Sequence, residues 1–165
     1  FLCAMFDGLF LTVLLSVAGT IVGLIAEMRL KARKEYFDEL DALLSRYAET
    51  LNFGMDTVPE LLKSYAPSSK LLGRHIPSAL ASMSACSEHA ELSGGYLTKA
   101  ESAFVGKLFA NLGTGNAESE KNRVARDRVM LSEYKAAAAD KYARMGKAGI
   151  KLGFLFGLLL SVLFW

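Results

Sequence analysis

The last third of the chain, Asn116–Trp165, reads NAESEKNRVARDRVMLSEYKAAAADKYARM over residues 116–145 and GKAGIKLGFLFGLLLSVLFW over residues 146–165. No proline interrupts it, and glycine occurs only in its second part. The first part is charged and consists mostly of good helix formers such as alanine, glutamate, lysine and leucine. The second part is apolar. The pattern predicts a single helix that leaves a cytosolic bundle and enters a membrane.

Small residues mark one face of the apolar part of this helix. They recur every four positions and are Gly149, Gly153, Gly157 and Ser161. A neighbouring helix backbone can approach such a face closely. Residues 152–165 carry no charge and would form about 21 Å of helix, against ~30 Å for a bilayer core. Snorkelling of Lys147 and Lys151 would lengthen this span, and a half-inserted anchor is the alternative.

A second apolar segment lies near the start of the chain. Residues 8–26 carry no charge and are long enough to cross a bilayer, and basic residues follow from Arg29 to Lys34. The positive-inside rule then predicts a cytosolic middle with both termini facing out. No positive charge precedes the segment and no cleavage pattern follows it, which argues against a signal peptide. Gly19 and Gly23 form a shorter pair of small residues.

We interpret the small residues in both apolar segments as sites of helix packing, either within the chain or with another protein. The alternative is that glycine is simply common in membrane helices. The sequence therefore predicts a transmembrane helix over residues 1–27, a cytosolic all-helical domain over 28–148 and a second transmembrane helix over 149–165. The expected fold class is all-α, an antiparallel helical bundle between two membrane helices.

Composition supports this division and excludes other classes. The chain has 165 residues, 52% of them hydrophobic, and a net charge of +2, which gives no nucleic-acid footprint. Every lysine and arginine lies within residues 29–151. Cys3 and Cys86 are too few for a disulfide framework.

A heptad-like stripe continues the first helix into the cytosol. Its members are spaced three or four residues apart and are Leu30, Arg33, Phe37, Leu40, Leu44, Tyr47 and Leu51, with Arg33 the one non-apolar exception. We expect Gly54 to end this helix. The stripe is the predicted partner of a seven-residue repeat in the last helix, formed by Val124, Leu131, Ala138 and Met145.

Shorter helices fill the middle. Asp56 or Thr57 is a suitable N-cap for a helix over 58–66, with Pro59 in its first turn. We expect Ser68 or Ser69 to cap a turn that Pro77 closes, and a separate helix over 78–91.

Capping signals also frame the last two helices. Thr98 and Glu101 have the spacing of a capping box. Gly113 is suited to end that helix, and Asn116 is suited to cap the last one. No strand pattern is present.

No catalytic constellation is apparent, so we expect neither enzymatic activity nor a cofactor. Cys86 and His89 have a ligand-like spacing, but no second pair stands near them, and a small core residue with a surface histidine is the simpler interpretation. The segment from Leu112 to Gly115 lacks the lysine of a phosphate-binding loop and fits a turn between helices. We therefore expect no metal site.

A charged patch at the start of the last helix is the candidate partner surface. Its members are Glu118, Glu120, Lys121, Arg123, Arg126, Asp127 and Arg128. The alternative is a solvated helix face with i,i+4 pairs such as Arg123 with Asp127.

Three stretches resemble the stage III sporulation protein AB family of endospore-forming bacteria. TLNFGMDTVPELLKSYA (50–66) resembles its glycine-containing turn and amphipathic helix, and this turn is also similar to one in F-type platform proteins of type II secretion and type IV pilus systems. ESAFVGKLFANLGTGNAESEKNRV (101–124) resembles its helix, polar cap and following helix. GIKLGFLFGLLLSVLF (149–164) resembles its glycine-rich C-terminal anchor.

The resemblance implies a membrane scaffold in the sporulation channel between mother cell and forespore. It implies a secretion-type ATPase similar to stage III sporulation protein AA as partner, together with other channel subunits, the lipid membrane and self-association. The implied location is the mother-cell membrane around the forespore. The alternatives are a general secretion or pilus F-like component and a membrane-anchored regulatory helical module.

Overall fold

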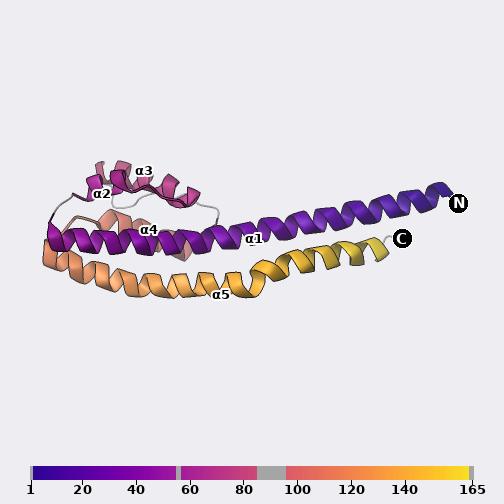
Figure 1. The fold of residues 1–165 in the computed structure, drawn as a ribbon. Helices are drawn as coiled ribbons and strands as arrows, with labels where there is room; N and C mark the ends of the chain where they lie inside the picture. The colour runs from indigo at the N-terminus through magenta and orange to yellow at the C-terminus, as the bar shows by residue number, and fades with distance from the viewer. Residues whose placement is uncertain (1, 55–56, 85–95, 164–165) are drawn as a thin grey trace. The chain divides into compact units, whose positions relative to one another are not determined.

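All secondary structure in the described residues is α-helical, as predicted. The computed structural model describes residues 2–54, 57–84 and 96–163. The helices are α1 (Leu2–Phe53), α2 (Val58–Ser64), α3 (Lys70–Ser84), α4 (Lys99–Asn111) and α5 (Ala117–Leu163) (Figure 1). The chain divides into a terminal unit, residues 1–31 with 139–165, and a central unit, residues 32–138.

The predicted long final helix is confirmed from Ala117 to Leu163. Asn116 caps it, because its Oδ1 accepts a hydrogen bond of 2.8 Å from the Ser119 amide. The glycines that follow α1 and α4 behave as expected. Gly54 (φ 65°) follows α1 and Gly113 (φ 78°) follows α4, both in the left-handed conformation that glycine adopts without strain.

The other predicted caps are also present. Thr57, one of the two proposed residues, is the N-cap of α2, and Pro59 lies in its first turn. Both hydrogen bonds of the Thr98–Glu101 capping box of α4 are formed. The Thr98 amide donates to the Glu101 carboxylate (2.8 Å), and the Glu101 amide donates to the Thr98 hydroxyl oxygen (3.3 Å). The helix α2 ends at Ser64 rather than at Ala66, because Tyr65 is already extended.

Pro77 does not end a helix, so this prediction was wrong. It lies inside α3, which runs from Lys70 to Ser84 and joins the two predicted segments. An interior proline costs a helix about 3 kcal/mol. The helix continues because its apolar face is buried on both sides of the proline, with Leu72 and Ile76 before it and Ala79 after it.

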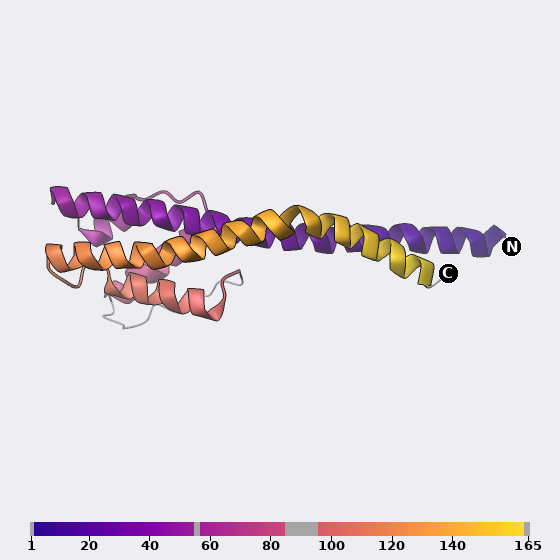
Figure 2. The same cartoon turned by 90° about the horizontal axis from the view of Figure 1, so that it is seen from below.

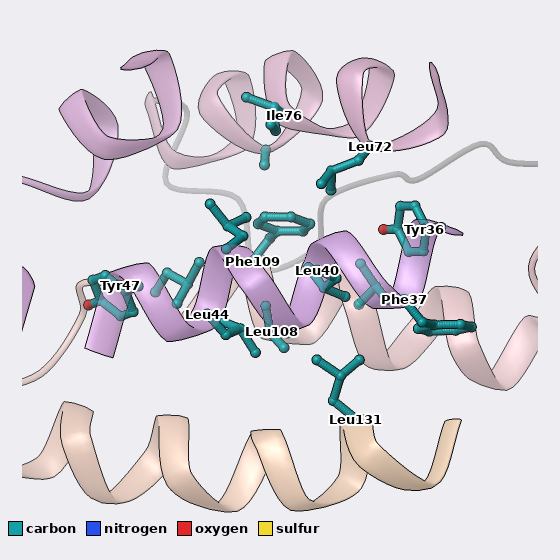
Figure 3. Close-up of a cluster of buried hydrophobic side chains, with 14 of the residues drawn as sticks. Tyr36, Phe37, Leu40, Leu44, Tyr47, Leu72, Ile76, Leu108, Phe109 and Leu131 are labelled. Atoms are coloured by element: carbon teal, nitrogen blue, oxygen red, sulfur yellow. The ribbon is translucent and has the colours of Figure 1, made fainter. Parts of the chain in front are cut away.

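The core of the central unit forms around the predicted stripe of α1. Phe37, Leu40 and Leu44 are at most 1% exposed. Figure 3 shows Leu72 and Ile76 of α3 pointing toward α1 from one side and Leu131 of α5 from the other. The α4 residues Leu108 and Phe109 are buried in the same cluster. The core thus joins α1, α3, α4 and α5.

α1 and α5 run antiparallel within the central unit, as predicted. Phe37 stacks on Tyr134 at 6.0 Å between ring centroids, whereas Tyr47, further along α1, bonds Glu120 earlier in α5. α4 lies alongside this part of α5 (Figure 2). The ring centroids of Phe104 in α4 and Tyr134 in α5 are 5.2 Å apart.

The seven-residue repeat of α5 holds for three of its four members. Val124, Leu131 and Ala138 are buried, but Met145 is 55% exposed. Met145 belongs to the terminal unit, beyond the core that buries the other three.

Candidate interaction surfaces

In the terminal unit, glycines of α1 and α5 lie against each other. A Cβ added at Gly149 would lie 3.6 Å from the Gly23 carbonyl oxygen. A Cβ added at Gly153 would collide with the carbonyl oxygen of Gly19. Because the backbone of α1 passes this close, only glycine fits at position 153 without a shift of the helices. The contact is between two helices of the same chain. The other two residues of the predicted ladder, Gly157 and Ser161, lie outside the described side chains.

The same unit presents a large apolar surface. Fifteen large hydrophobic side chains there are 36–68% exposed: Val13, Leu14, Val17, Ile21, Val22, Leu24, Ile25, Met28, Met145, Leu152, Phe154, Leu155, Phe156, Leu158 and Leu159. Contiguous exposed apolar surface of this kind marks an interaction with protein or lipid. Within residues 2–54, 57–84 and 96–163, no helix is long and apolar enough to cross a membrane.

At the turn between α4 and α5, Glu120 is the central acceptor. Its carboxylate accepts hydrogen bonds from the Tyr47 hydroxyl (2.9 Å) and from the amides of Gly113 (3.3 Å) and Gly115 (2.9 Å), and it pairs with Arg123. Burial by itself would raise the pKa of Glu120. The hydrogen bond from Tyr47 and the other donors outweigh burial, so the pKa is lowered.

These contacts correct the predicted charged patch. Glu120 is only 1% exposed and therefore cannot belong to a solvent-facing docking surface. Arg123 turns back to the Asn111 carbonyl and the Thr114 hydroxyl (3.2 Å). Its bonds thus go to this turn and not to Asp127, the i,i+4 partner named in the alternative interpretation of the patch. Sequence reasoning missed the burial because the partners of Glu120 come from α1 and from the turn.

The rest of the patch is distributed over different sides of α5. Glu118, Lys121 and Arg126 are exposed. Arg128 lies on the side facing α1, where it bonds Asp41 at 3.3 Å. A partner role for these four residues stays a prediction.

The side of α5 facing α1 carries a closed set of ion pairs. Lys135 lies 3.0 Å from Asp41 and 3.4 Å from Asp38, and Lys34 lies 2.9 Å from Asp38. Burial tends to raise the pKa of Asp41, but the hydrogen bond and charge of Lys135 lower it overall. Each of these charged groups therefore has a partner of opposite charge on this side.

The side of α5 facing α4 is different. Asp127 is half-buried, and Arg123, Arg126 and Lys107 of α4 are close enough to oppose the rise that burial causes in its pKa. Burial dominates, so the pKa of Asp127 is raised. Among the described residues, neither Lys107 nor Arg126 forms an ion pair. Met130, four residues after Arg126 in α5, is 52% exposed.

Two further buried polar pairs hold α1 to its neighbours. Arg33, the exception in the α1 stripe, binds Glu101 of α4, with 3.1 Å from Nε to Oε1. The Tyr36 hydroxyl lies 2.8 Å from Nδ1 of His75 in α3, and burial lowers the pKa of His75. Glu39 accepts hydrogen bonds of 2.8 Å from the amides of Ser68 and Ser69, just before α3. Ser69, one of the two serines proposed as the cap, occupies the N-cap position, since its carbonyl accepts a hydrogen bond of 3.0 Å from the Gly73 amide.

No group of three or more potential ligands that could hold a metal ion occurs within the described residues. Cys86 and His89, whose spacing is ligand-like but for which we expected no metal site, lie outside the described residues, in the gap between residues 84 and 96.

The comparisons with known proteins identify one family. A family model described as Stage III sporulation protein AB matches residues 8–165, which is nearly the whole chain. No curated protein and no solved structure gives a match.

Proposed function

Since the chain belongs to the stage III sporulation protein AB family, we propose that it is a membrane scaffold of the sporulation channel between mother cell and forespore. It docks a secretion-type ATPase, similar to stage III sporulation protein AA, to the membrane subunits of the channel. It catalyses no reaction of its own and binds no cofactor. Its location is the mother-cell membrane around the forespore.

The exposed apolar surface of the terminal unit is the observation that carries the membrane part of this proposal. Leaving such side chains in water costs about 25 cal/mol for each Å² of apolar area. A lipid environment removes that cost. The basic residues that follow the first apolar segment, from Arg29 to Lys34, favour a cytosolic position for the central unit.

The contact between glycines of α1 and α5 supports a paired arrangement of the two apolar segments. Lipid provides no hydrophobic force between helices, so close backbone packing at small residues has to hold them together. Gly19 and Gly153 provide that packing within one chain. The helical pair then anchors the central unit at both of its ends.

The scaffold role of the central unit is supported by its construction. It has its own apolar core and buried polar pairs, so it can present a fixed surface to a partner. The family match supports the sporulation setting. The ATPase and the channel subunits are the partners that this setting and the resemblance suggest.

A labelling experiment on the two natural cysteines tests the topology. In intact non-sporulating cells that express the chain in the plasma membrane, a membrane-impermeant maleimide should label a Cys86→Ser variant, which retains Cys3 outside. It should not label a Cys3→Ser variant until the membrane is permeabilised. Equal labelling of both variants in intact cells would disprove the proposed orientation, and recovery of the chain in the soluble fraction would disprove the anchor.

A pull-down tests the scaffold role. The tagged chain is solubilised from sporulating cells in mild detergent, and co-purifying proteins are identified by mass spectrometry. We expect the secretion-type ATPase and at least one membrane channel subunit. Recovery of neither, from membranes that contain both, would refute the scaffold proposal.

A further inference from the structure

The glycine contacts determine which positions of α1 and α5 lie at the same level in the terminal unit. Gly149 and Gly153 of α5 face Gly23 and Gly19 of α1, in that order, so the two helices run antiparallel there. A step toward higher numbers in α1 therefore matches a step toward lower numbers in α5. Each step advances about 1.5 Å along the helix.

Four basic residues lie at one level in this register. Arg29 and Lys31 are about 9 and 12 Å along α1 from the glycine that meets Gly149. Arg144 and Lys141 are about 8 and 12 Å along α5 from Gly149, in the same direction. We call these four residues the basic band. All four are exposed, so both helices present cations to the surroundings at the same level.

Positive charge exceeds negative charge around the basic band. The terminal unit contains six basic residues and three acidic ones, and the acids close to the band are Glu27 and Asp140. Asp140 pairs with Arg144 at 2.8 Å, but the two side chains are 57% and 77% exposed, so water screens this pair. The two basic residues outside the band follow it in α5 and are Lys147 and Lys151.

The basic band borders the exposed apolar surface of the same unit. Met28, next to Arg29 in α1, is 68% exposed, and Met145, next to Arg144 in α5, is 55% exposed. The other exposed hydrophobic side chains continue from these methionines away from the band, toward lower numbers in α1 and higher numbers in α5. The change from charged to apolar side chains thus occurs at the same level on both helices.

An anionic bilayer is the partner that matches both features. Its lipid tails would cover the exposed apolar side chains, and its phosphates, at the edge of the apolar layer, would meet the cations. An acidic protein segment would pair with the cations but would also have to cover fifteen exposed hydrophobic side chains on two helices. A free phosphate ion would leave all of them uncovered.

We propose that the basic band, formed by Arg29, Lys31, Lys141 and Arg144, binds the phosphates of anionic phospholipids such as phosphatidylglycerol and selects them over neutral lipids. The inference deepens the proposed membrane role and rests on it, because it takes a bilayer as the surroundings of the apolar surface. Orientation by the positive-inside rule requires only that basic residues lie on one side of the membrane. Lipid selection requires in addition that they contact the headgroups.

Electron paramagnetic resonance on the full chain in phosphatidylcholine nanodiscs tests the selection. A trace of spin-labelled phosphatidylglycerol, or of spin-labelled phosphatidylcholine, reports how much of each lipid the protein immobilises. Each basic residue near an anionic surface can strengthen the attraction about fivefold, so the parent chain should hold phosphatidylglycerol at least about threefold more strongly than phosphatidylcholine. Salt at about 1 M should remove most of this preference.

Neutralising the band should abolish the preference. The triple variant Arg29→Gln, Lys31→Gln and Lys141→Gln should hold the two lipids equally to within about 1.5-fold. The matched control also replaces one arginine and two lysines that are exposed, but in the central unit, and consists of Lys63→Gln, Lys70→Gln and Arg74→Gln. It changes the net charge by the same amount and should keep the preference of the parent chain.

A charge-conserving variant separates the charge of the band from its shape. Arg29→Lys combined with Lys31→Arg and Lys141→Arg keeps every positive charge and should keep the preference. Circular dichroism melts of all variants should match the parent chain, which shows that altered lipid association does not come from unfolding.

The outcomes distinguish lipid selection from the membrane anchor. Equal association of both lipids with a parent chain that is held in the nanodiscs overturns the selection, leaves the anchor standing and makes an acidic protein segment the next partner to test. Equal loss of preference in the triple variant and its control also overturns it, because net charge alone would then be the cause. If the chain is recovered only in the soluble fraction, the anchor fails. Flotation of the chain with phosphatidylglycerol vesicles but not with phosphatidylcholine vesicles would then support the band, and any other flotation result would overturn it.

Discussion

Replacing Glu120 by alanine should destabilise the central unit by about 3–5 kcal/mol, the usual cost of removing one partner of a buried ion pair. Glu120 is 1% exposed and accepts bonds from Tyr47, Gly113 and Gly115 besides pairing with Arg123. Hydrogen bonds to a charged group contribute about 1.5–3 kcal/mol each, so four of them would sum to more than the expected loss.

The smaller figure follows from where the donors lie. The amides of Gly113 and Gly115 are in an exposed turn, and water replaces the carboxylate there when the side chain is removed. The Tyr47 hydroxyl is buried, with the residue only 3% exposed, so it loses its partner outright. The buried hydroxyl and the unpaired guanidinium therefore dominate the loss.

Urea unfolding of the full chain in mild detergent, followed by circular dichroism, measures this effect. Glu118→Ala is the control, because Glu118 lies in the same helical turn but is exposed, and it should change stability by less than about 0.5 kcal/mol. Tyr47→Phe combined with Glu120→Ala should cost less than the sum of the single changes. Equal stability of Glu120→Ala and Glu118→Ala would refute the assignment of Glu120 as a structural acceptor.

The same residue predicts a dependence on pH. The folded state lowers the pKa of Glu120, so its contribution is complete above the unfolded pKa of about 4.3 and is lost as pH falls through the lower folded value. The parent chain should therefore lose more stability than Glu120→Ala between pH 5 and pH 3. A parallel decline of both would contradict the lowered pKa.

Three other changes should have effects with distinct causes. Because burial lowers the pKa of His75, the parent chain should lose stability below about pH 6.5, by up to about 1.4 kcal/mol per pH unit, whereas His75→Phe should not. Gly113→Ala should lower the free energy of unfolding by about 1–2 kcal/mol because of its positive φ. The new Cβ would also lie 2.8 Å from Val58 Cγ2, and Val58→Ala should relieve the part of the loss that this contact causes. Gly153→Ile should separate α1 and α5 in the terminal unit and lower the midpoint of an SDS titration, whereas Leu155→Ile, at an exposed position, should not.

Each of these has a contrary result. Identical pH profiles of parent and His75→Phe between pH 6.5 and 5 would show that His75 is not buried neutral. Additive losses in the Gly113→Ala and Val58→Ala pair, measured by urea unfolding, would show that the two groups are not in contact. Equal SDS midpoints for Gly153→Ile and Leu155→Ile would show that the glycine contact does not hold the helices.

Local signals in the sequence were sufficient for most of the helices. The caps at Thr57, Thr98 and Asn116 and the glycines at positions 54 and 113 act within a few residues of the chain, so the sequence alone can indicate them. Pro77 was misinterpreted for the opposite reason. Its local effect disfavours a helix, and only the packing of α3 on α1 outweighs that effect.

The interaction surfaces were harder to predict because carboxylates usually lie in solvent. Nothing within a few residues of Glu39, Glu101 or Glu120 indicates which distant part of the chain supplies their partners. Arg33 was the one usable signal. A charged residue at a core position of a heptad stripe requires a buried partner of opposite charge, and the sequence could therefore have predicted one buried acid, although not which.

These buried polar pairs solve a problem that the apolar stripes leave open. Leucine-rich stripes on two antiparallel helices would pack nearly as well after a shift of one heptad, because apolar contacts are not directional. Glu120 bonded to Tyr47 and Glu101 bonded to Arg33 permit only one alignment of α5 and α4 on α1. A shift would bury unpaired charges at several kcal/mol each. The proposed scaffold role requires such a fixed alignment. Under that proposal, we expect Tyr47→Phe with Arg33→Met to impair docking more than its loss of stability alone would explain.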